Sequence, residues 1–236
     1  MRAVVLSGGR GTRLRPYTTV LPKPLMPIGD SPILDVVLRQ LVNAGFDRVT
    51  LSVGYLAELI RAYCGDGSRY GVRLHYLQEE EPLGTVGPLG LLDDFTEPLL
   101  LMNGDVLTDL DPRKLWDFHL SSGACLTLAL HRRPVTISFG VVDEMRGSEI
   151  RRYVEKPTKE YLVGMGIYVL EPSVKAFIPR GRRMDFPDLV NALIQAGRKV
   201  VGWETDAYWL DIGRPDDYER AQTDFEQLKS RFSLDR

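Results

Sequence analysis

Glycines and arginines alternate near the N-terminus, where residues 7–16 read SGGRGTRLRP. Glycine tolerates positive φ, so successive backbone N–H groups can converge on an anion. Arg10, Arg13 and Arg15 add fixed positive charge for phosphate oxygens. A tight turn between a strand and a helix would also use the glycines, but three neighbouring arginines repel one another unless an anion lies among them. The segment therefore favours a phosphate-binding loop.

This loop differs from two common nucleotide-binding motifs. It has no Gly-Lys followed by Ser or Thr, as a Walker A loop has, and Leu14 stands where the third glycine of GxGxxG would be. ATPase and dehydrogenase chemistry are both disfavoured. Further along, Lys23 lies between Pro22 and Pro24, which hold the backbone extended while its ammonium group can reach the same phosphates. Taken alone, this tripeptide would equally fit a rigid surface turn with a solvated lysine.

Two aspartates follow apolar runs. Asp105 comes after residues 99–102 and an Asn-Gly step, and Asp211 comes after residues 208–210 and before a glycine. Ligands of α/β proteins bind at the carboxyl ends of parallel strands, so we expect Asp105 to face the glycine loop. Asn-Gly is also the commonest hairpin turn, which would make Asp105 only its polar flank. Asp211, taken alone, could be a carboxylate that merely precedes a helix.

Other catalytic groups are scarce. His75, His119 and His131 are isolated in the sequence, which favours surface or structural roles. No GxSxG elbow and no Cys/His pair offers a covalent nucleophile. Cys64 and Cys125 have neither CxxC nor Cys/His spacing, so neither a disulfide framework nor a zinc site is indicated and a reducing cytoplasm fits.

Charge and hydropathy exclude several classes of partner. The 236 residues hold 30 Lys and Arg against 32 Asp and Glu, a net charge of −2. No field of one sign therefore covers the surface to recruit nucleic acid or an anionic membrane. The first apolar run is too short for a signal peptide, and no run is long enough to span a membrane. We expect a cytoplasmic protein that binds neither nucleic acid nor membrane.

The residues that could do chemistry need elements to position them. Short apolar or β-branched runs alternate with helical patterns, which predicts an α/β fold whose mostly parallel sheet carries helices on both faces. Strands are predicted at residues 3–6, 49–53, 73–77, 99–102 and 126–130. One helix is predicted to end just before Gly45, with Ser31 as its N-cap and Pro32 as its first helical residue. Further helices are predicted at about 55–64, after Gly84, at 111–121, at 186–196 and from Pro215 onward.

The pattern changes after Gly123. Residues 139–142, 150–155 and 162–170 are closely spaced strand-like segments, which predicts an antiparallel addition to the sheet. No repeat or flexible linker divides the chain, so we expect one domain over residues 1–236. The residues after about Phe225 are polar and are predicted to fray.

Several motifs together carry a family resemblance. LSGGRGTRLRPYTTVLPKP at residues 6–24 closely resembles the signature of the sugar-1-phosphate nucleotidylyltransferases, usually LAGGxGTRLxPxT followed by PKP, with Ser7 in place of alanine. The resemblance continues through EPLGT at 81–85, NGD at 103–105, EKP at 155–157, GIYVLEP at 166–172 and YWLDIGRPDDY at 208–218. It implies the Rossmann-like nucleotide-diphospho-sugar transferase fold: a nucleotide-binding part at about 1–122, a sugar-phosphate-binding part at about 123–215 and a C-terminal helix at about 215–230.

The resemblance also implies a reaction. In this family the 1-phosphate of a sugar attacks the α-phosphorus of a nucleoside triphosphate in line, and pyrophosphate leaves. By matching positions, Asp105 and Asp211 would bind Mg²⁺, a cation that prefers one or two carboxylates plus phosphate oxygens. Arg13, Lys23 and Asp105 would be catalytic, because two polyanions can be joined only where cations offset their repulsion.

Matching positions give two further sets of residues. The implied nucleotide-binding residues are Leu6, Gly8, Gly9, Gly11, Thr12, Arg13, Lys23, Gln78, Glu79, Gly84 and Thr85. The implied sugar-phosphate-binding residues are Gly140, Glu155, Lys156, Gly164 and Gly166. Lys156 would contact the sugar phosphate and Glu155 the sugar hydroxyls, whereas Gly164 stands where relatives often carry asparagine.

The base and the sugar are less constrained. A carboxylate can accept two hydrogen bonds from guanine, so one of Glu79, Glu80 and Glu81 could read that base, Glu79 first. Three adjacent glutamates are also typical of a solvated loop. The chain most resembles short mannose-1-phosphate or heptose-1-phosphate guanylyltransferases, so guanylyl transfer to one of these sugars is favoured; uridylyl or thymidylyl transfer to glucose 1-phosphate or an amino-sugar 1-phosphate is the alternative.

One alternative belongs to another class, since some proteins of this fold are catalytically silent regulatory subunits. A degenerate copy would lose its functional residues first, and this chain keeps Arg13, Lys23, Asp105, Lys156 and Asp211. The chain is predicted to carry this activity alone, and the resemblance allows a homodimer whose interface the sequence does not identify.

Overall fold

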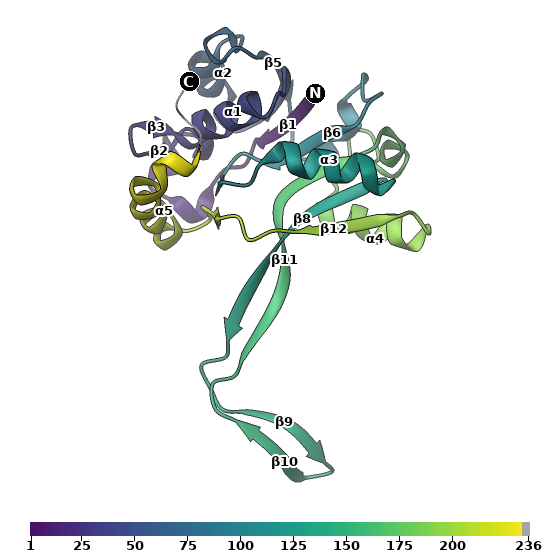
Figure 1. Cartoon of the computed structure of the whole chain (residues 1–236). Coiled ribbons are helices and arrows are strands. Elements are labelled where there is room, and N and C mark those ends of the chain that lie inside the picture. Colours follow the sequence, from purple (N-terminus) through teal and green to yellow (C-terminus); the bar gives the residue numbers. More distant parts are fainter. Residues whose placement is uncertain (233–236) are drawn as a thin grey trace.

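A seven-stranded sheet forms the centre of the computed structural model, which describes residues 1–232 (Figure 1). Its order is β12-β8-β11-β6-β1-β4-β5. Strands β6, β1, β4 and β5 run parallel, whereas β11 is antiparallel to both β6 and β8. These strands are β1 Arg2–Ser7, β4 Arg48–Val53, β5 Arg73–Gln78, β6 Leu99–Asn103, β8 Leu126–Thr136, β11 Thr158–Leu170 and β12 Val200–Glu204. The predicted mixed, mostly parallel sheet with an antiparallel addition is confirmed.

Three two-stranded sheets and five α-helices complete the described part of the chain. The small sheets pair β2 Pro27–Ile28 with β3 Ser31–Pro32, β7 Val106–Thr108 with β13 Trp209–Asp211, and β9 Val141–Arg146 with β10 Glu149–Val154. The helices are α1 Ile33–Asn43, α2 Ala57–Cys64, α3 Pro112–Ser122, α4 Phe186–Gln195 and α5 Pro215–Leu228. None of the helices within residues 1–232 is both long and apolar enough to cross a bilayer.

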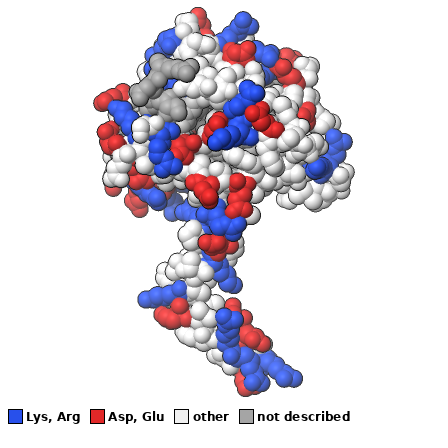
Figure 2. All heavy atoms as spheres, in the orientation of Figure 1, with Lys and Arg blue, Asp and Glu red and all other residues white. Residues whose placement is uncertain are grey.

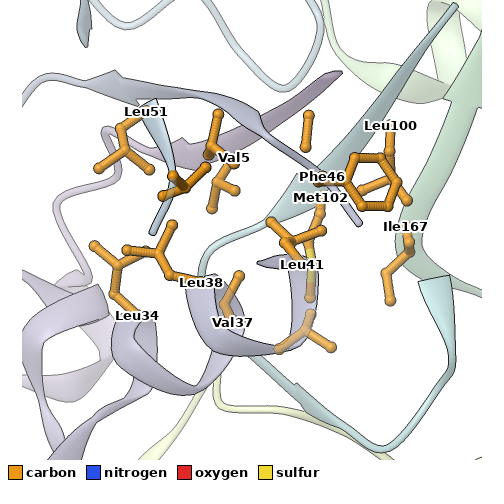
Figure 3. Packing of buried hydrophobic residues seen from close by; sticks show 14 of the residues in the cluster. Val5, Leu34, Val37, Leu38, Leu41, Phe46, Leu51, Leu100, Met102 and Ile167 are labelled. Atoms are coloured by element: carbon orange, nitrogen blue, oxygen red, sulfur yellow. The ribbon is translucent and has the colours of Figure 1, made fainter. Parts of the chain in front are cut away.

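Both faces of the sheet are buried because successive strand residues point to opposite sides. In β1, Val5 packs with Leu38 and Leu41 of α1 on one face (Figure 3), whereas Val4 packs in the cluster that contains Leu189 of α4 on the other. Each of these side chains is fully buried. The continuous apolar runs seen in the sequence therefore reflect strands covered on both faces.

Three predicted helix starts differ from the structure. Ser31 pairs with Ile28 in a short β-bridge, so Pro32 takes the N-cap position and α1 begins at Ile33. The helix expected from residue 55 begins at Ala57, after Leu56 adopts a left-handed conformation with φ 55°. After Gly84 the chain forms a 3₁₀ helix, Gly87–Leu91, whose two glycines disfavour the α-helix.

A long two-stranded arm leaves the body of the molecule. It comprises residues 131–163: the second half of β8, the β9–β10 hairpin and the first half of β11 (Figure 1). The β8–β11 ladder stays in register from Leu130 opposite Gly164 to Thr136 opposite Thr158. The irregularity between Gly164 and Tyr168 marks the point where the ribbon meets the sheet.

The prediction that residues after Phe225 fray is wrong for the described ones. Helix α5 continues to Leu228, and a 3₁₀ turn follows over Lys229–Phe232. Phe232 is fully buried: its ring stacks on Phe225 with 5.3 Å between centroids and meets Tyr208 edge-on. Phe232, together with Leu228, which packs against the same cluster, therefore anchors this end; residues 233–236, also included in that prediction, lie outside the described residues.

Replacing this anchor should destabilise the fold. We expect Phe232→Ala to lower the free energy of unfolding by about 3 kcal/mol, and thus Tm by roughly 6–12 °C. Differential scanning calorimetry measures both. Ile194→Ala, at a side chain that is 57% exposed, is the matched control and should leave Tm nearly unchanged. Equal Tm values for Phe232→Ala and the unmodified chain would show that the terminal turn is not anchored.

Candidate active site

The glycine-rich loop follows β1 directly and has a fixed shape. Gly11 has φ 58°, its carbonyl accepts hydrogen bonds from the Leu14 N–H at 2.9 Å and the Thr18 hydroxyl at 2.8 Å, and a Cβ there would lie 2.8 Å from the Thr18 methyl group. Both the left-handed conformation and the lack of space require glycine at this position. The loop is therefore held in one conformation by contacts within the chain.

Many of the predicted nucleotide-binding residues line two adjoining cavities, which we call the cleft. One cavity measures about 270 Å³ and the other about 300 Å³, and they share Gly8, Glu79 and Pro82. The predicted residues that line the cleft are Leu6, Gly8, Gly9, Gln78, Glu79, Gly84, Thr85 and Asp105. Segments from the ends of β1, β5 and β6 thus converge at the carboxyl edge of the sheet, as expected for a doubly wound fold.

Glu79 is held at the wall of the cleft. One carboxylate oxygen accepts a hydrogen bond from the Ser52 hydroxyl at 2.7 Å, and the other accepts one from the Leu83 N–H at 3.0 Å. The same carboxylate occupies the space that a Cβ on Gly8 would need, at 2.8 Å. Through these contacts Glu79 helps to hold the glycine loop and the segment before Gly84 in place, independently of any ligand. Glu80 and Glu81 also line the cleft and are exposed.

The segment around Gly84 is fastened to the start of α4. The Asp185 carboxylate accepts a hydrogen bond from the Thr85 N–H at 3.3 Å, and the Thr85 hydroxyl accepts one from the Phe186 N–H at 2.7 Å. Gly84 has φ 80°, and a Cβ there would lie 2.6 Å from the Met184 carbonyl oxygen. These bonds link the cleft wall to a helix that follows it by a hundred residues.

Asp105 lies in the turn between β6 and β7, and the Lys23 ammonium group contacts its carboxylate. Strand β7 pairs with β13 rather than with β6, so Asn103–Gly104 does not form a hairpin turn. Lys23 itself is buried in the 3₁₀ turn that the flanking prolines shape. The structure thus joins the proline-bounded lysine and the strand-end aspartate, which lie 82 residues apart.

The pairing of β7 with β13 also sets Asp211 beside Asp105. Asp211 lies opposite Val106, and the Ile212 N–H donates to the Asp105 carbonyl oxygen at 3.1 Å. Partial burial, and next the negative charge of Asp105, raise the pKa of the Asp211 carboxyl, against the opposing effect of Lys23 and Arg13. Two carboxylates in mutual repulsion have the donor set that a hard divalent cation prefers.

The number of carboxylates fits a cation shared with a substrate. Within residues 1–232 no group of three or more His, Cys, Asp or Glu side chains gathers as a metal cage. Mg²⁺ usually takes one or two protein carboxylates and completes its shell with phosphate oxygens and water. The residues present therefore fit this cation, with Asp105 and Asp211 as its candidate ligands.

A larger cavity of about 630 Å³ opens beside Asp211. Arg13 reaches it from the glycine loop, and its guanidinium lies about 3.5 Å from the position a Cβ on Gly213 would take. Three more arginines line this cavity: Arg133, Arg214 and Arg220. Positive charge from the loop, the arm and the start of α5 thus gathers in the cavity that Asp211 lines.

The predicted sugar-phosphate residues divide into two groups. Gly166, with φ 75°, lies in the sheet against the Asn103 side chain, 2.6 Å from where a Cβ would stand. Gly164 marks the base of the arm and has open space where a side chain would start. Gly140, Glu155 and Lys156 all lie in the distal part of the arm, away from the cleft (Figure 1). A single chain therefore does not bring this whole set to the aspartate pair.

Sequence reasoning missed several residues that shape the site. Ser52 and Asp185 act through the contacts described above, and neither their types nor their spacing marks them. The Trp209 indole N–H donates to the Met165 carbonyl oxygen at 2.9 Å, which ties β13 to β11. His131, interpreted as isolated, lines the larger cavity, and its Nδ1 is buried without a hydrogen-bond partner in the structure.

The aspartate pair should make stability depend on pH. A carboxyl whose pKa is raised by folding disfavours its charged form in the native state, so its contribution to stability is present at low pH and is lost as pH rises through the folded pKa. We expect Asp211→Asn, measured in EDTA, to have a higher Tm than the unmodified chain at pH 7, and this difference to shrink toward pH 4. The fully exposed Asp30 provides the control Asp30→Asn, with little change. A lower Tm for Asp211→Asn at pH 7 would contradict the repulsion.

Comparison with known proteins agrees with the geometry. The chain is 38% identical over 232 residues to the mannose-1-phosphate guanylyltransferase of Mycobacterium tuberculosis, covering 94% of this chain and 64% of the relative. It is 34% identical over 241 residues to the UTP–glucose-1-phosphate uridylyltransferase of Synechocystis, covering 94% and 62% respectively. The chain thus spans slightly under two thirds of the length of these curated relatives.

Solved structures share the fold. The crystal structure of HddC from Yersinia pseudotuberculosis superposes with a TM-score of 0.73 at 26% identity, covering 95% of this chain and 99% of that one. The same protein has been solved complexed with GMP-PN. The sequence profile described as "Nucleotidyl transferase" matches residues 2–228. On this match, which spans nearly the whole sheet and both sides of the cleft, the chain belongs to the nucleotidyl transferase family.

Proposed function

We propose that this chain joins a nucleoside triphosphate to a sugar 1-phosphate, giving a nucleoside diphosphate sugar and pyrophosphate. The observation that carries this proposal is the convergence of the glycine-rich loop, Lys23 and the pair Asp105 and Asp211 at one edge of the sheet. Relatives named for both guanylyl and uridylyl transfer support the same reaction class. Residues 1–122 would bind the nucleotide, and residues 123–215 the sugar phosphate.

The reaction needs positioning and charge neutralisation rather than a covalent nucleophile. The backbone N–H groups of the glycine loop and the side chains of Arg13 and Lys23 would bind the triphosphate. Their positive charge offsets the repulsion between the two phosphate substrates and favours the departure of pyrophosphate. Mg²⁺, when bound by Asp105 and Asp211, supplies further charge neutralisation to the phosphate oxygens.

We propose guanylyl transfer as the preferred reaction. The first relative named is a mannose-1-phosphate guanylyltransferase, and the similar HddC structure was solved with GMP-PN. The carboxylate of Glu79 lines the cleft with lone pairs left after its two hydrogen bonds, and Glu80 and Glu81 lie next to it. Any of the three can accept from the N1–H and 2-amino group of guanine. The uridylyltransferase relative makes UTP the second candidate.

For the sugar, we propose mannose 1-phosphate or a heptose 1-phosphate. Gly166 leaves room for the Asn103 side chain, which lines the cleft, whereas Gly164 offers no side chain to a sugar hydroxyl. A cytoplasmic location, where nucleoside triphosphates are available, suits the two cysteines, both buried and free.

The direct test is a screen for pyrophosphate release, with Mg²⁺, of the five common nucleoside triphosphates against a panel of sugar 1-phosphates. We expect the highest kcat/KM for GTP with mannose 1-phosphate or a heptose 1-phosphate.

Asp105→Asn should lower kcat by at least about 100-fold while leaving the fold intact by circular dichroism. Asp30→Asn is the matched control. No release with any pair would reject the proposed function in favour of a silent subunit, and near-normal turnover by Asp105→Asn would reject the metal site.

A second measurement separates the two phosphate sites. If Lys156 binds the sugar phosphate, Lys156→Ala should raise the KM for the sugar phosphate roughly 10- to 100-fold, the cost of one charged hydrogen bond. The KM for the nucleotide should change little. Lys159→Ala, three residues further along the same arm, is the matched control. A rise confined to the nucleotide KM would show that Lys156 serves the other substrate.

A further inference from the structure

The arm holds two of the proposed site residues far from the cleft of its own chain. Between the Gly164–Leu130 and Thr158–Thr136 pairs the ribbon extends six residue steps, roughly 20 Å at the usual rise of a strand. Glu155 and Lys156 lie beyond that end. Figure 1 shows the junction of β10 and β11 well away from the body that carries the aspartate pair, so within one chain the pair lacks the cation proposed for the sugar phosphate.

The ribbon is braced in this extended form. At its base Arg132 forms ion pairs with Glu204 of β12, at 2.6 Å, and with Glu160 of β11, at 3.5 Å. At its far end the hydroxyls of Thr136 and Thr158 are hydrogen-bonded at 2.8 Å. The structure therefore favours an arm that reaches outward.

The arm carries an unusual concentration of exposed apolar side chains. Of the fourteen large hydrophobic residues that are exposed among those described, nine lie in it. They are Val135, Ile137, Phe139, Val142, Met145, Ile150, Tyr153, Tyr161 and Leu162. Phe139 is the extreme case, with 75% of its surface exposed. Apolar surface gathered in this way is typical of a region that another protein surface covers.

The net charges of the arm and of the rest of the chain indicate that a second copy of this chain covers the arm. The arm contains seven Lys and Arg against five Asp and Glu, a net charge of +2. The rest of the chain holds the other 23 basic and 27 acidic residues, a net charge of −4. Figure 2 shows basic and acidic side chains along the arm with uncharged surface between them. The net charges of the arm and of the body are therefore opposite in sign, and the body lacks, within one chain, the lysine proposed for the sugar phosphate.

The chain turns sharply where the arm carries its functional pair. Lys156 has φ 46°, an uncommon conformation for a residue other than glycine, and its N–H donates to the Phe139 carbonyl oxygen at 3.3 Å. This turn separates the β9–β10 hairpin from the ribbon. It sets Lys156 next to Phe139, the most exposed apolar residue of the arm. The apolar contact surface and the phosphate-binding lysine therefore lie together.

We propose that two copies of this chain exchange arms, so that Glu155 and Lys156 of each copy complete the sugar-phosphate side of the other copy's cleft. A two-fold axis makes the exchange reciprocal and closed, because each arm is used once. The larger cavity beside Asp211, at the base of the resident arm, is the place where the incoming arm enters. The assignment of Lys156 to the sugar phosphate rests on the proposed function; the exchange itself does not.

The exchange is tested first without any substrate. Light scattering of the purified chain should give the mass of a dimer, and Phe139→Asp, which places a charge in the exchanged surface, should shift it toward a monomer. Ile194→Asp, at an exposed apolar residue of α4, should remain dimeric. A monomeric unmodified chain, or a Phe139→Asp variant as dimeric as the control, would overturn the proposal. This result holds whether or not the proposed activity is found.

Mixing two impaired variants, assayed at a sugar-phosphate concentration well below the raised KM of Lys156→Ala, then tests whether the arm acts in the other copy. The Asp105→Asn chain has an intact arm but an impaired cleft. The Lys156→Ala chain has an intact cleft but lacks the lysine of the arm. If the site is shared, co-expression should restore about a quarter of the unmodified specific activity, because half of the dimers are mixed and each has one intact site. If Lys156 serves its own cleft, mixing restores nothing, and the proposal fails while the activity of the unmodified chain still supports the proposed function.

Discussion

The pairing of β7 with β13 brings two carboxylates together, and the proposed chemistry depends on that contact. Three residues of each strand join the loop after β6 to the segment before α5, and this sets Asp211 beside Asp105. Burial and repulsion raise the pKa of Asp211, so the pairing costs stability when no cation is present. A divalent cation shared with a triphosphate would offset that cost. Local destabilisation of this kind is common where a site must bind a charged ligand tightly.

The remaining elements position groups around this pair. The glycine-rich loop extends from the parallel strand β1, and Lys23 reaches the pair from a 3₁₀ turn bounded by prolines. Glu79 and Asp185 hold the opposite wall of the cleft through hydrogen bonds to Ser52 and Thr85. Most of these contacts join segments far apart in the chain. The cleft is therefore formed by tertiary structure, which preorganises it for two polyanionic substrates.

The sequence predicted six of the seven strands of the central sheet, because the inner strands are covered on both faces and appear as continuous apolar runs, but it did not predict the edge strand β12. It placed Asp105 at a strand end facing the glycine loop, as the structure does. Its errors were local: Ser31 forms a bridge instead of an N-cap, and Phe232 anchors an end predicted to fray. The arm could not be predicted, since alternating segments indicate hairpins without showing where a hairpin points. The contacts of Glu79 with Ser52 and Leu83 were equally hidden, because they depend on how β4 and β5 align.

Binding of the nucleotide in the absence of turnover tests the central role of the aspartate pair most directly. Titration calorimetry with GTP alone, in Mg²⁺ and then in EDTA, measures how far binding depends on a divalent cation. We expect the unmodified chain to bind GTP at least about tenfold more tightly in Mg²⁺, a difference of about 1.4 kcal/mol, and Asp211→Asn to lose this difference. Equal affinity in Mg²⁺ and EDTA, or an undiminished effect of Mg²⁺ on Asp211→Asn, would contradict this role.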